Sequence, residues 1–153
     1  MLAHNLQYNA VSVQIWYDYM TLGEINVLVG QAEWAWRDAI RNIFAPRGVN
    51  SLIAANAAGA LDIIERRRIH AAIVDMDSQS AGGLGIVRVI RRYHPVLPCI
   101  MVSTVSERRV LGSALELDVF GVVAKPVDMQ ILQEELNRLF VKKYNSMVFQ
   151  ETF

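Results

Sequence analysis

The stretch IHAAIVDMDSQSAGGLG, residues 69–85, indicates the fold of this chain. Its apolar part ends on a carboxylate, Asp75, and small and polar residues follow. This order is typical of a buried parallel strand whose C-terminal end carries one acidic side chain to the rim of an open α/β sheet, where such folds place their chemistry. Asp75 is therefore the first candidate for a functional residue. A plainer interpretation is that Asp75 ends the strand and starts a turn together with Asp77, as short polar side chains commonly do.

The composition indicates one soluble domain without a polyanionic partner. The chain has 153 residues, of which 53% are hydrophobic and 20% are charged, enough for one sizeable core and too little for two. Its formal net charge is zero, so no overall basic field would attract nucleic acid or an acidic membrane surface. We therefore expect neither nucleic acid nor a membrane among its partners.

The single cysteine and the lack of targeting patterns favour a cytoplasmic protein. Cys99 lies inside an apolar run and has no second cysteine to pair with, which excludes an internal disulfide and argues against a cysteine-based metal site. No basic region followed by an apolar segment marks a signal peptide, and no stretch approaches the roughly 18 apolar residues that span a bilayer. We expect neither secretion nor membrane insertion.

From residue 25 onward, short apolar runs alternate with amphipathic segments. The runs that predict strands are residues 25–29, 51–54, 69–74, 99–102 and 121–124. Helical spacing of apolar residues predicts helices over about 32–43, 57–67, 84–93, 108–117 and 129–140. In the first helix the apolar set includes Trp36, Ile40 and Ile43. Five βα units in series predict one parallel sheet covered by helices on both faces, a three-layer α/β/α arrangement.

Polar residues stand at the ends of several predicted strands. Asp75, Ser103 and Lys125 follow the third, fourth and fifth strands, and Gly30 with Gln31 follow the first. Because the C-terminal ends of parallel strands share one edge of the sheet, we expect these positions to gather there. An aspartate beside a hydroxyl and an ammonium suits a carboxylate that accepts a phosphoryl group, since the ammonium offsets the added charge and the hydroxyl donates to a phosphoryl oxygen.

At residues 25–140 the chain resembles the receiver domains of two-component response regulators. The resemblance rests on three motifs in order, namely IVDMDSQSAGGLG, PCIMVST and FGVVAKPVD. It implies a flavodoxin-like (βα)5 fold with strand order 2-1-3-4-5. It also divides the chain into an N-terminal extension, residues 1–24, a receiver-like domain, residues 25–140, and a tail, residues 141–153.

The resemblance assigns a role to each matching residue. It makes Asp75 the phosphoacceptor, Ser103 the switch hydroxyl and Lys125 the lysine that contacts the phosphoryl group. It implies a cis peptide bond between Lys125 and Pro126. Gly83 corresponds to the glycine that lets the following loop turn. Asp77 corresponds to a position that normally gives its backbone carbonyl to a metal ion.

One departure from the family pattern concerns the metal site. Receiver domains carry two acidic residues after the first strand, which bind Mg²⁺ together with the acceptor, and here those positions are Gly30 and Gln31. Mg²⁺ needs oxygen ligands with enough negative charge to offset its dehydration. Asp75 and Asp77 are the weak metal candidates that remain. We therefore expect no cofactor, or Mg²⁺ bound weakly, and a direct pair between Asp75 and Lys125.

These features predict a degenerate receiver that is not an enzyme and acts through protein–protein contacts. The expected partners are a histidine kinase, a downstream effector or a second copy of the chain. The default docking surface, by resemblance, is built from the predicted helix 108–117, strand 121–124 and helix 129–140. Two alternatives stay open: a working receiver phosphorylated on Asp75 by a histidine kinase, and a pseudo-receiver that binds a small ligand at the vacated acidic pocket.

The segment before residue 25 has two competing patterns. If it is helical, one apolar face is formed by Val13, Trp16, Tyr17 and Met20. Apolar residues also alternate from residue 11 to 15, as they do in a strand. A segment this apolar should not lie free in water, so we expect it to pack on the helical layer of the domain or on a partner chain. The sequence gives no period for residues 141–153.

Overall fold

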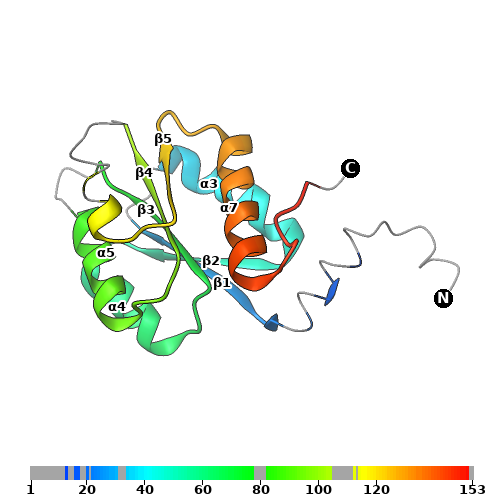
Figure 1. Cartoon of the computed structure of the whole chain (residues 1–153), viewed down its shortest axis with the longest axis horizontal. Coiled ribbons are helices and arrows are strands. Elements are labelled where there is room, and N and C mark those ends of the chain that lie inside the picture. Colours follow the sequence, from blue (N-terminus) through cyan, green and yellow to red (C-terminus); the bar gives the residue numbers. More distant parts are fainter. Residues whose placement is uncertain are drawn as a thin grey trace, which may run out of the picture.

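The computed structural model describes residues 22–30, 34–77, 82–104 and 114–151, together with Val13, Trp16, Tyr17, Met20 and Gly112. Five parallel strands form one sheet in the order β2-β1-β3-β4-β5, which confirms the predicted fold (Figure 1). The strands are β1 (Ile25–Gly30), β2 (Val49–Ala54), β3 (Ala71–Asp75), β4 (Cys99–Ser103) and β5 (Gly121–Ala124). Within the described ranges, no helix is both long and apolar enough to cross a bilayer.

Helices cover both faces of this sheet, and each face buries its own core. Helices α3 (Trp34–Phe44) and α7 (Met129–Tyr144) lie on one face, and α4 (Ala57–Arg66) and α5 (Gly82–Tyr93) on the other (Figure 1). Along β1, Val27 and Val29 belong to the α3/α7 core, and Leu28 belongs to the α4/α5 core. This alternation follows from the two-residue period of a strand. It explains why the strands of a sheet covered on both faces are apolar throughout.

The expected boundaries differ from the observed ones at several elements, and two of these differences have a clear physical reason. Strand β3 begins at Ala71 rather than at residue 69, because the Asn26 N–H donates to the His70 ring at Nδ1 (3.1 Å) instead of to a strand carbonyl. Helix α7 runs to Tyr144 rather than to residue 140, and Asn145 in the left-handed conformation (φ 51°) then ends it. In the expected helix 108–117, Gly112 and residues 114–116 are helical, and its other residues except 117 lie outside the described ranges.

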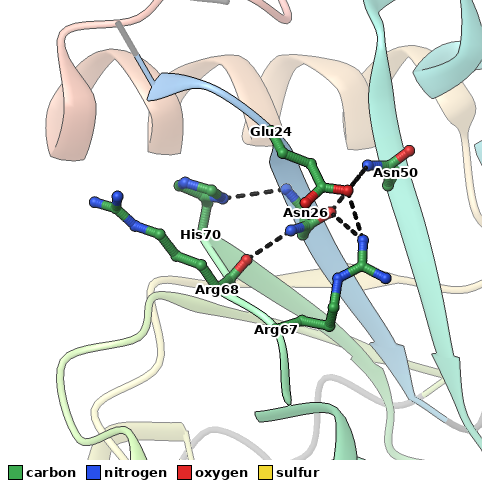
Figure 2. Close-up of polar contacts among 6 residues, drawn as sticks. All are labelled: Glu24, Asn26, Asn50, Arg67, Arg68 and His70. Atoms are coloured by element: carbon green, nitrogen blue, oxygen red, sulfur yellow. Dashed lines mark hydrogen bonds and ion pairs between the residues drawn. The ribbon is translucent and has the colours of Figure 1, made fainter. Parts of the chain in front are cut away.

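A polar cluster joins β1, β2 and β3 at the edge of the sheet where these strands begin. Figure 2 shows its members, Glu24, Asn26, Asn50, Arg67, Arg68 and His70. The fully buried Asn26 amide donates to the Arg68 carbonyl (2.8 Å) and accepts from the Asn50 amide (3.0 Å). The His70 N–H donates to the Asn26 carbonyl (2.9 Å). The buried polar atoms of Asn26 therefore have partners, as buried amides require.

The tail that follows α7 completes the core on the α3/α7 face. Val148 and Phe149 are fully buried there. The Phe149 ring lies 5.3 Å from the Phe44 ring and 4.9 Å from the Phe140 ring, measured between centroids. These aromatic contacts join the tail to α3 and α7. The tail to residue 150 is therefore part of the packed domain.

Four described residues of the N-terminal segment are helical and exposed. Val13, Trp16, Tyr17 and Met20 expose between 56% and 69% of their surface. Packing of this apolar face on the helical layer of the domain is therefore wrong for these four side chains. Leu22 packs against the core, and Gly23 follows with φ 66° where the chain turns into β1. A partner chain remains the predicted cover for the exposed face.

Candidate functional site

The ends of β3, β4 and β5 bring Asp75, Ser103 and Lys125 together. The parallel ladder places Asp75 beside Val102 and Ser103 beside Ala124, and the Lys125 N–H donates to the Ser103 carbonyl (2.8 Å). Asp75 and Ser103 are almost fully buried. The sequence therefore predicted correctly that these three residues share one edge of the sheet.

The Asp75 carboxylate is held by three donors. Its Oδ2 atom lies 2.7 Å from Lys125 Nζ and accepts from Trp36 Nε1 at 3.3 Å. Its Oδ1 atom accepts from the Asp77 N–H at 3.0 Å. The predicted direct pair between Asp75 and Lys125 is confirmed. Burying this charge requires such a pair, since an isolated carboxylate in the interior would be strongly destabilising.

Trp36 is a contact of the site that the sequence did not indicate. The helical spacing correctly assigned this tryptophan to the apolar set of α3, and it is buried against the sheet. A buried indole N–H usually finds an acceptor. Two features of the sequence together could have indicated this contact. A tryptophan faces inward near the start of the helix that follows β1, and the adjacent strand β3 ends on a carboxylate.

Asp77 contributes its side chain to the site. Asp77 Oδ1 accepts from the Ser103 hydroxyl (3.2 Å), and Asp77 Oδ2 accepts from the Thr104 N–H (2.6 Å) and lies 3.4 Å from Lys125 Nζ. Burial acts to raise the pKa of Asp77, but the Thr104 N–H and the Lys125 ammonium outweigh it and leave the pKa below its usual value. Asp77 is therefore a carboxylate at neutral pH. The family resemblance had indicated a metal contact through its backbone only.

Two further features implied by the resemblance also lie at this edge of the sheet, namely the Lys125–Pro126 peptide bond and Gly83. The peptide bond between Lys125 and Pro126 is cis, as expected. Gly83 stands in the first turn of α5, where a Cβ atom would overlap the carbonyl oxygen of Asp75. The glycine is therefore required by the close approach of α5 to β3, whereas the resemblance had related it to the turn of a loop.

Comparison with known proteins identifies the family. Residues 27–137 match the family model of the response regulator receiver domain. The chain belongs to this family. It is 31% identical over 104 residues to an NtrX-like response regulator of Rickettsia bellii, an alignment that covers 67% of this chain and 22% of that protein. It is 22% identical over 119 residues to sporulation initiation phosphotransferase F of Bacillus subtilis, covering 78% of this chain and 96% of that one.

Solved receiver structures share the fold. The signal receiver domain of an HD domain-containing protein from Pseudomonas fluorescens has a TM-score of 0.70 at 16% identity, over 80% of this chain and 99% of that one. Chemotaxis protein CheY4 of Vibrio cholerae has a TM-score of 0.68 at 19% identity, over 76% and 99%. The receiver described here spans less than a quarter of the length of the Rickettsia relative.

The acidic pair that receiver domains carry after the first strand has no counterpart among the described residues. Gly30 ends β1 on the α4/α5 face, and a Cβ atom there would lie 2.9 Å from the Ile86 Cδ1 atom. A carboxylate at this position would therefore enter an apolar core. Gln31 lies outside the described residues. Among those that the structure describes, no three His, Cys, Asp or Glu side chains are placed to hold a metal ion.

A cleft of about 710 Å³ opens beside this receiver site, between α3 and the segment after β5. The residues that line it are Trp36, Ala39, Thr104, Lys125, Pro126, Val127 and Met129. The wall is mostly apolar, with polar atoms supplied where the cleft meets the site. A concave apolar surface with a few polar groups is the usual form of a small-molecule site.

Proposed function

We propose that this receiver domain acts through protein–protein contacts in the cytoplasm and does not accept a phosphoryl group on Asp75 by the metal-dependent route. The observation that carries the proposal is the Asp75 carboxylate, whose two oxygens already accept from Lys125, Trp36 and the Asp77 N–H. This arrangement satisfies the carboxylate without a metal ion. These contacts offset the negative charge that would otherwise bind Mg²⁺ and attack phosphorus.

The described donor set does not fit Mg²⁺. Two carboxylates are present, Asp75 and Asp77, and the Lys125 ammonium lies within ion-pair distance of both. A hard divalent ion prefers an octahedral set of oxygen ligands with several negative charges. Binding of Mg²⁺ between these carboxylates would bring a second cation next to Lys125, and the two positive charges would repel each other.

We infer that the partner is a histidine kinase, a downstream effector or a second copy of the chain. The surface that receivers commonly use combines the segment around residues 112–117 with β5 and α7. Two large apolar side chains are exposed there, Leu115 (84%) and Ile131 (52%). Their exposure on this surface supports a docking role.

The decisive experiment exposes the protein to acetyl phosphate, and separately to beryllofluoride, in the presence of Mg²⁺. We expect intact-mass spectrometry to show unmodified protein and fluorine NMR to show no bound beryllofluoride. A receiver domain that retains the acidic pair serves as the positive control. Stoichiometric modification that Asp75→Asn abolishes would contradict the proposal and support a receiver phosphorylated on Asp75 by a histidine kinase.

A second candidate function is binding of a small ligand in the cleft beside Trp36. The apolar wall with Lys125 and Thr104 at its inner end favours this candidate. Native mass spectrometry of the freshly purified protein tests it. A stoichiometric non-protein adduct that Ala39→Trp removes by filling the cleft would support ligand binding. An adduct-free wild type that also shows no electron density in crystals would exclude it.

A further inference from the structure

Three donors from two strand ends converge on the side chain of Asp77. The Ser103 hydroxyl and the Thr104 N–H come from the end of β4, and the Lys125 ammonium comes from the end of β5. The Asp77 carboxylate accepts from the first two and lies 3.4 Å from the third. This residue stands only two positions after Asp75, whose own carboxylate also contacts Lys125.

These contacts are not those of a residue that merely ends a turn. The side chain of a turn aspartate usually bonds to the backbone two or three residues away. The Asp77 side chain reaches Ser103 and Thr104, which are 26 and 27 positions away along the chain. Its own N–H meanwhile donates to Asp75 Oδ1, which directs the carboxylate across the strand ends. The placement of Asp77 is therefore a tertiary contact.

The same three donors are what a phosphoryl group on Asp75 would require. Such a group brings three acceptor oxygens that carry about 1.5–2 negative charges at neutral pH, in place of the single charge of the Asp75 carboxylate. A hydroxyl, a backbone N–H and an ammonium are suitable donors for these oxygens. Because the donors lie around one point beside Asp75, the Asp77 carboxylate lies where such oxygens would lie.

We propose that Asp77 is an internal anion that occupies the phosphoryl-oxygen site of this receiver. The chain thereby holds Ser103, Thr104 and Lys125 in an anion-bound arrangement without phosphorylation. This inference rests on the proposed function, in which Asp75 is not phosphorylated by the metal-dependent route. It adds a specific residue that fills the site and keeps other oxyanions out.

The inference predicts that removal of the carboxylate creates a site for a small oxyanion. In Asp77→Ala the three donors lose the Asp77 carboxylate, while Lys125 keeps its pair with Asp75, and inorganic phosphate or acetate can then bind in the place of that carboxylate. We expect phosphate to bind Asp77→Ala at least about tenfold more tightly than wild type. The backbone amide of Thr104 is the reporter, because its NMR shift responds directly to a new acceptor. Titrations in phosphate and in chloride at equal ionic strength separate binding from general screening.

Two further variants make the test specific. Asp62→Ala removes an equally negative charge from α4, where Asp62 pairs with Arg66, and should leave the phosphate response as in wild type. Asp77→Ala combined with Ser103→Ala removes one donor and should lose most of the gained affinity. If Asp77→Ala does not fold, Asp77→Asn replaces it in the test, because asparagine keeps the side-chain volume and removes the charge. On addition of phosphate, the NMR shift of the Thr104 amide should then change more in Asp77→Asn than in wild type.

The result that overturns the inference is an equal phosphate response of wild type and both Asp77 variants. A gain in affinity that survives loss of the Ser103 hydroxyl would overturn it as well. The proposed function fails separately, if wild-type protein is modified by acetyl phosphate or beryllofluoride. The two proposals can therefore fail independently. If the wild-type protein remains unmodified and the Asp77 variants respond to phosphate no more than wild type, only the proposal that Asp77 is an internal anion is refuted.

Discussion

At the scale of single residues, the buried imidazole of His70 has a defined tautomer. Its Nδ1 atom accepts from the Asn26 N–H, so the proton of the neutral ring is on Nε2. The Nε2 atom is buried and has no hydrogen-bond partner among the described residues. Burial, with smaller contributions from the positive charges of Arg68 and His94, lowers the pKa of His70 below its usual value of 6.5, although the backbone of Asn26 and the negative charge of Glu24 act in the opposite direction.

We therefore expect the protein to lose stability as the pH falls below about 6.5. The unfolded chain binds a proton at His70 before the folded chain does, so the free energy of unfolding declines from the unfolded pKa downward and levels off below the folded pKa. Urea unfolding of wild type and His70→Gln at pH 7.5 and pH 5.5 measures the effect. His94→Gln removes a positive charge that acts on His70, and it should keep most of the pH dependence because burial is the larger cause. An unchanged pH dependence in His70→Gln would contradict the prediction.

Lys125 supports the second prediction at this scale, because it is the cation that compensates both Asp75 and Asp77. Lys125→Met keeps the length of the side chain and removes its charge. Leaving a buried carboxylate without its cation typically costs about 3–5 kcal/mol of unfolding free energy. Urea denaturation should show a loss of this order, and Asp75→Asn added to Lys125→Met should recover part of it. A double variant no more stable than the single variant would argue against the pair as the cause.

At the scale of elements, the contact between α5 and β3 positions the site. Gly83 allows the first turn of α5 to approach the carbonyl oxygen of Asp75, the residue that ends β3. An added Cβ would force the helix away from the strand end. Overpacking of this kind typically costs about 1–3 kcal/mol. The same approach therefore stabilises the domain and fixes the backbone from which the Asp75 carboxylate projects.

We expect Gly83→Ala to lower the melting temperature and to weaken the Asp75 contacts. Gly112→Ala is the matched control, since a Cβ on Gly112 has no neighbour within 4 Å and alanine favours a helix by up to about 1 kcal/mol. Differential scanning calorimetry of the two variants compares their stabilities. A Gly83→Ala variant as stable as Gly112→Ala would show that α5 can shift without cost.

At the scale of the whole molecule, the exposed apolar face of the N-terminal segment predicts self-association. Val13 and Met20 expose more than half of their surface, as do Trp16 and Tyr17 between them. Burial of apolar surface stabilises association by about 25 cal/mol per Å² before the costs of ordering. We expect deletion of residues 1–21 to lower the mass seen in light scattering from that of a dimer to that of a monomer. An unchanged mass would mean that the segment has no role in assembly.

The sequence alone was sufficient for the architecture and for three residues of the candidate site. Alternation of apolar runs with amphipathic segments determined the five βα units, because strands covered on both faces are apolar throughout and helices repeat near every third or fourth residue. Asp75, Ser103 and Lys125 could be grouped because the ends of parallel strands lie at one edge of the sheet. The loss of the acidic pair at Gly30 and Gln31 was also visible as residue identities.

The tertiary structure decided the contacts that depend on side-chain direction between distant segments. The sequence placed Trp36 on the inner face of its helix, but only the packing of α3 on the sheet brings its N–H to Asp75. The Asp77 carboxylate could equally have pointed to solvent, and its partners at the end of β4 lie more than 25 residues away. The tail has no period, yet Phe149 fills the space between Phe44 and Phe140. Periodicity reports which face of an element is buried, whereas the partner across that face depends on how the separate elements pack in three dimensions.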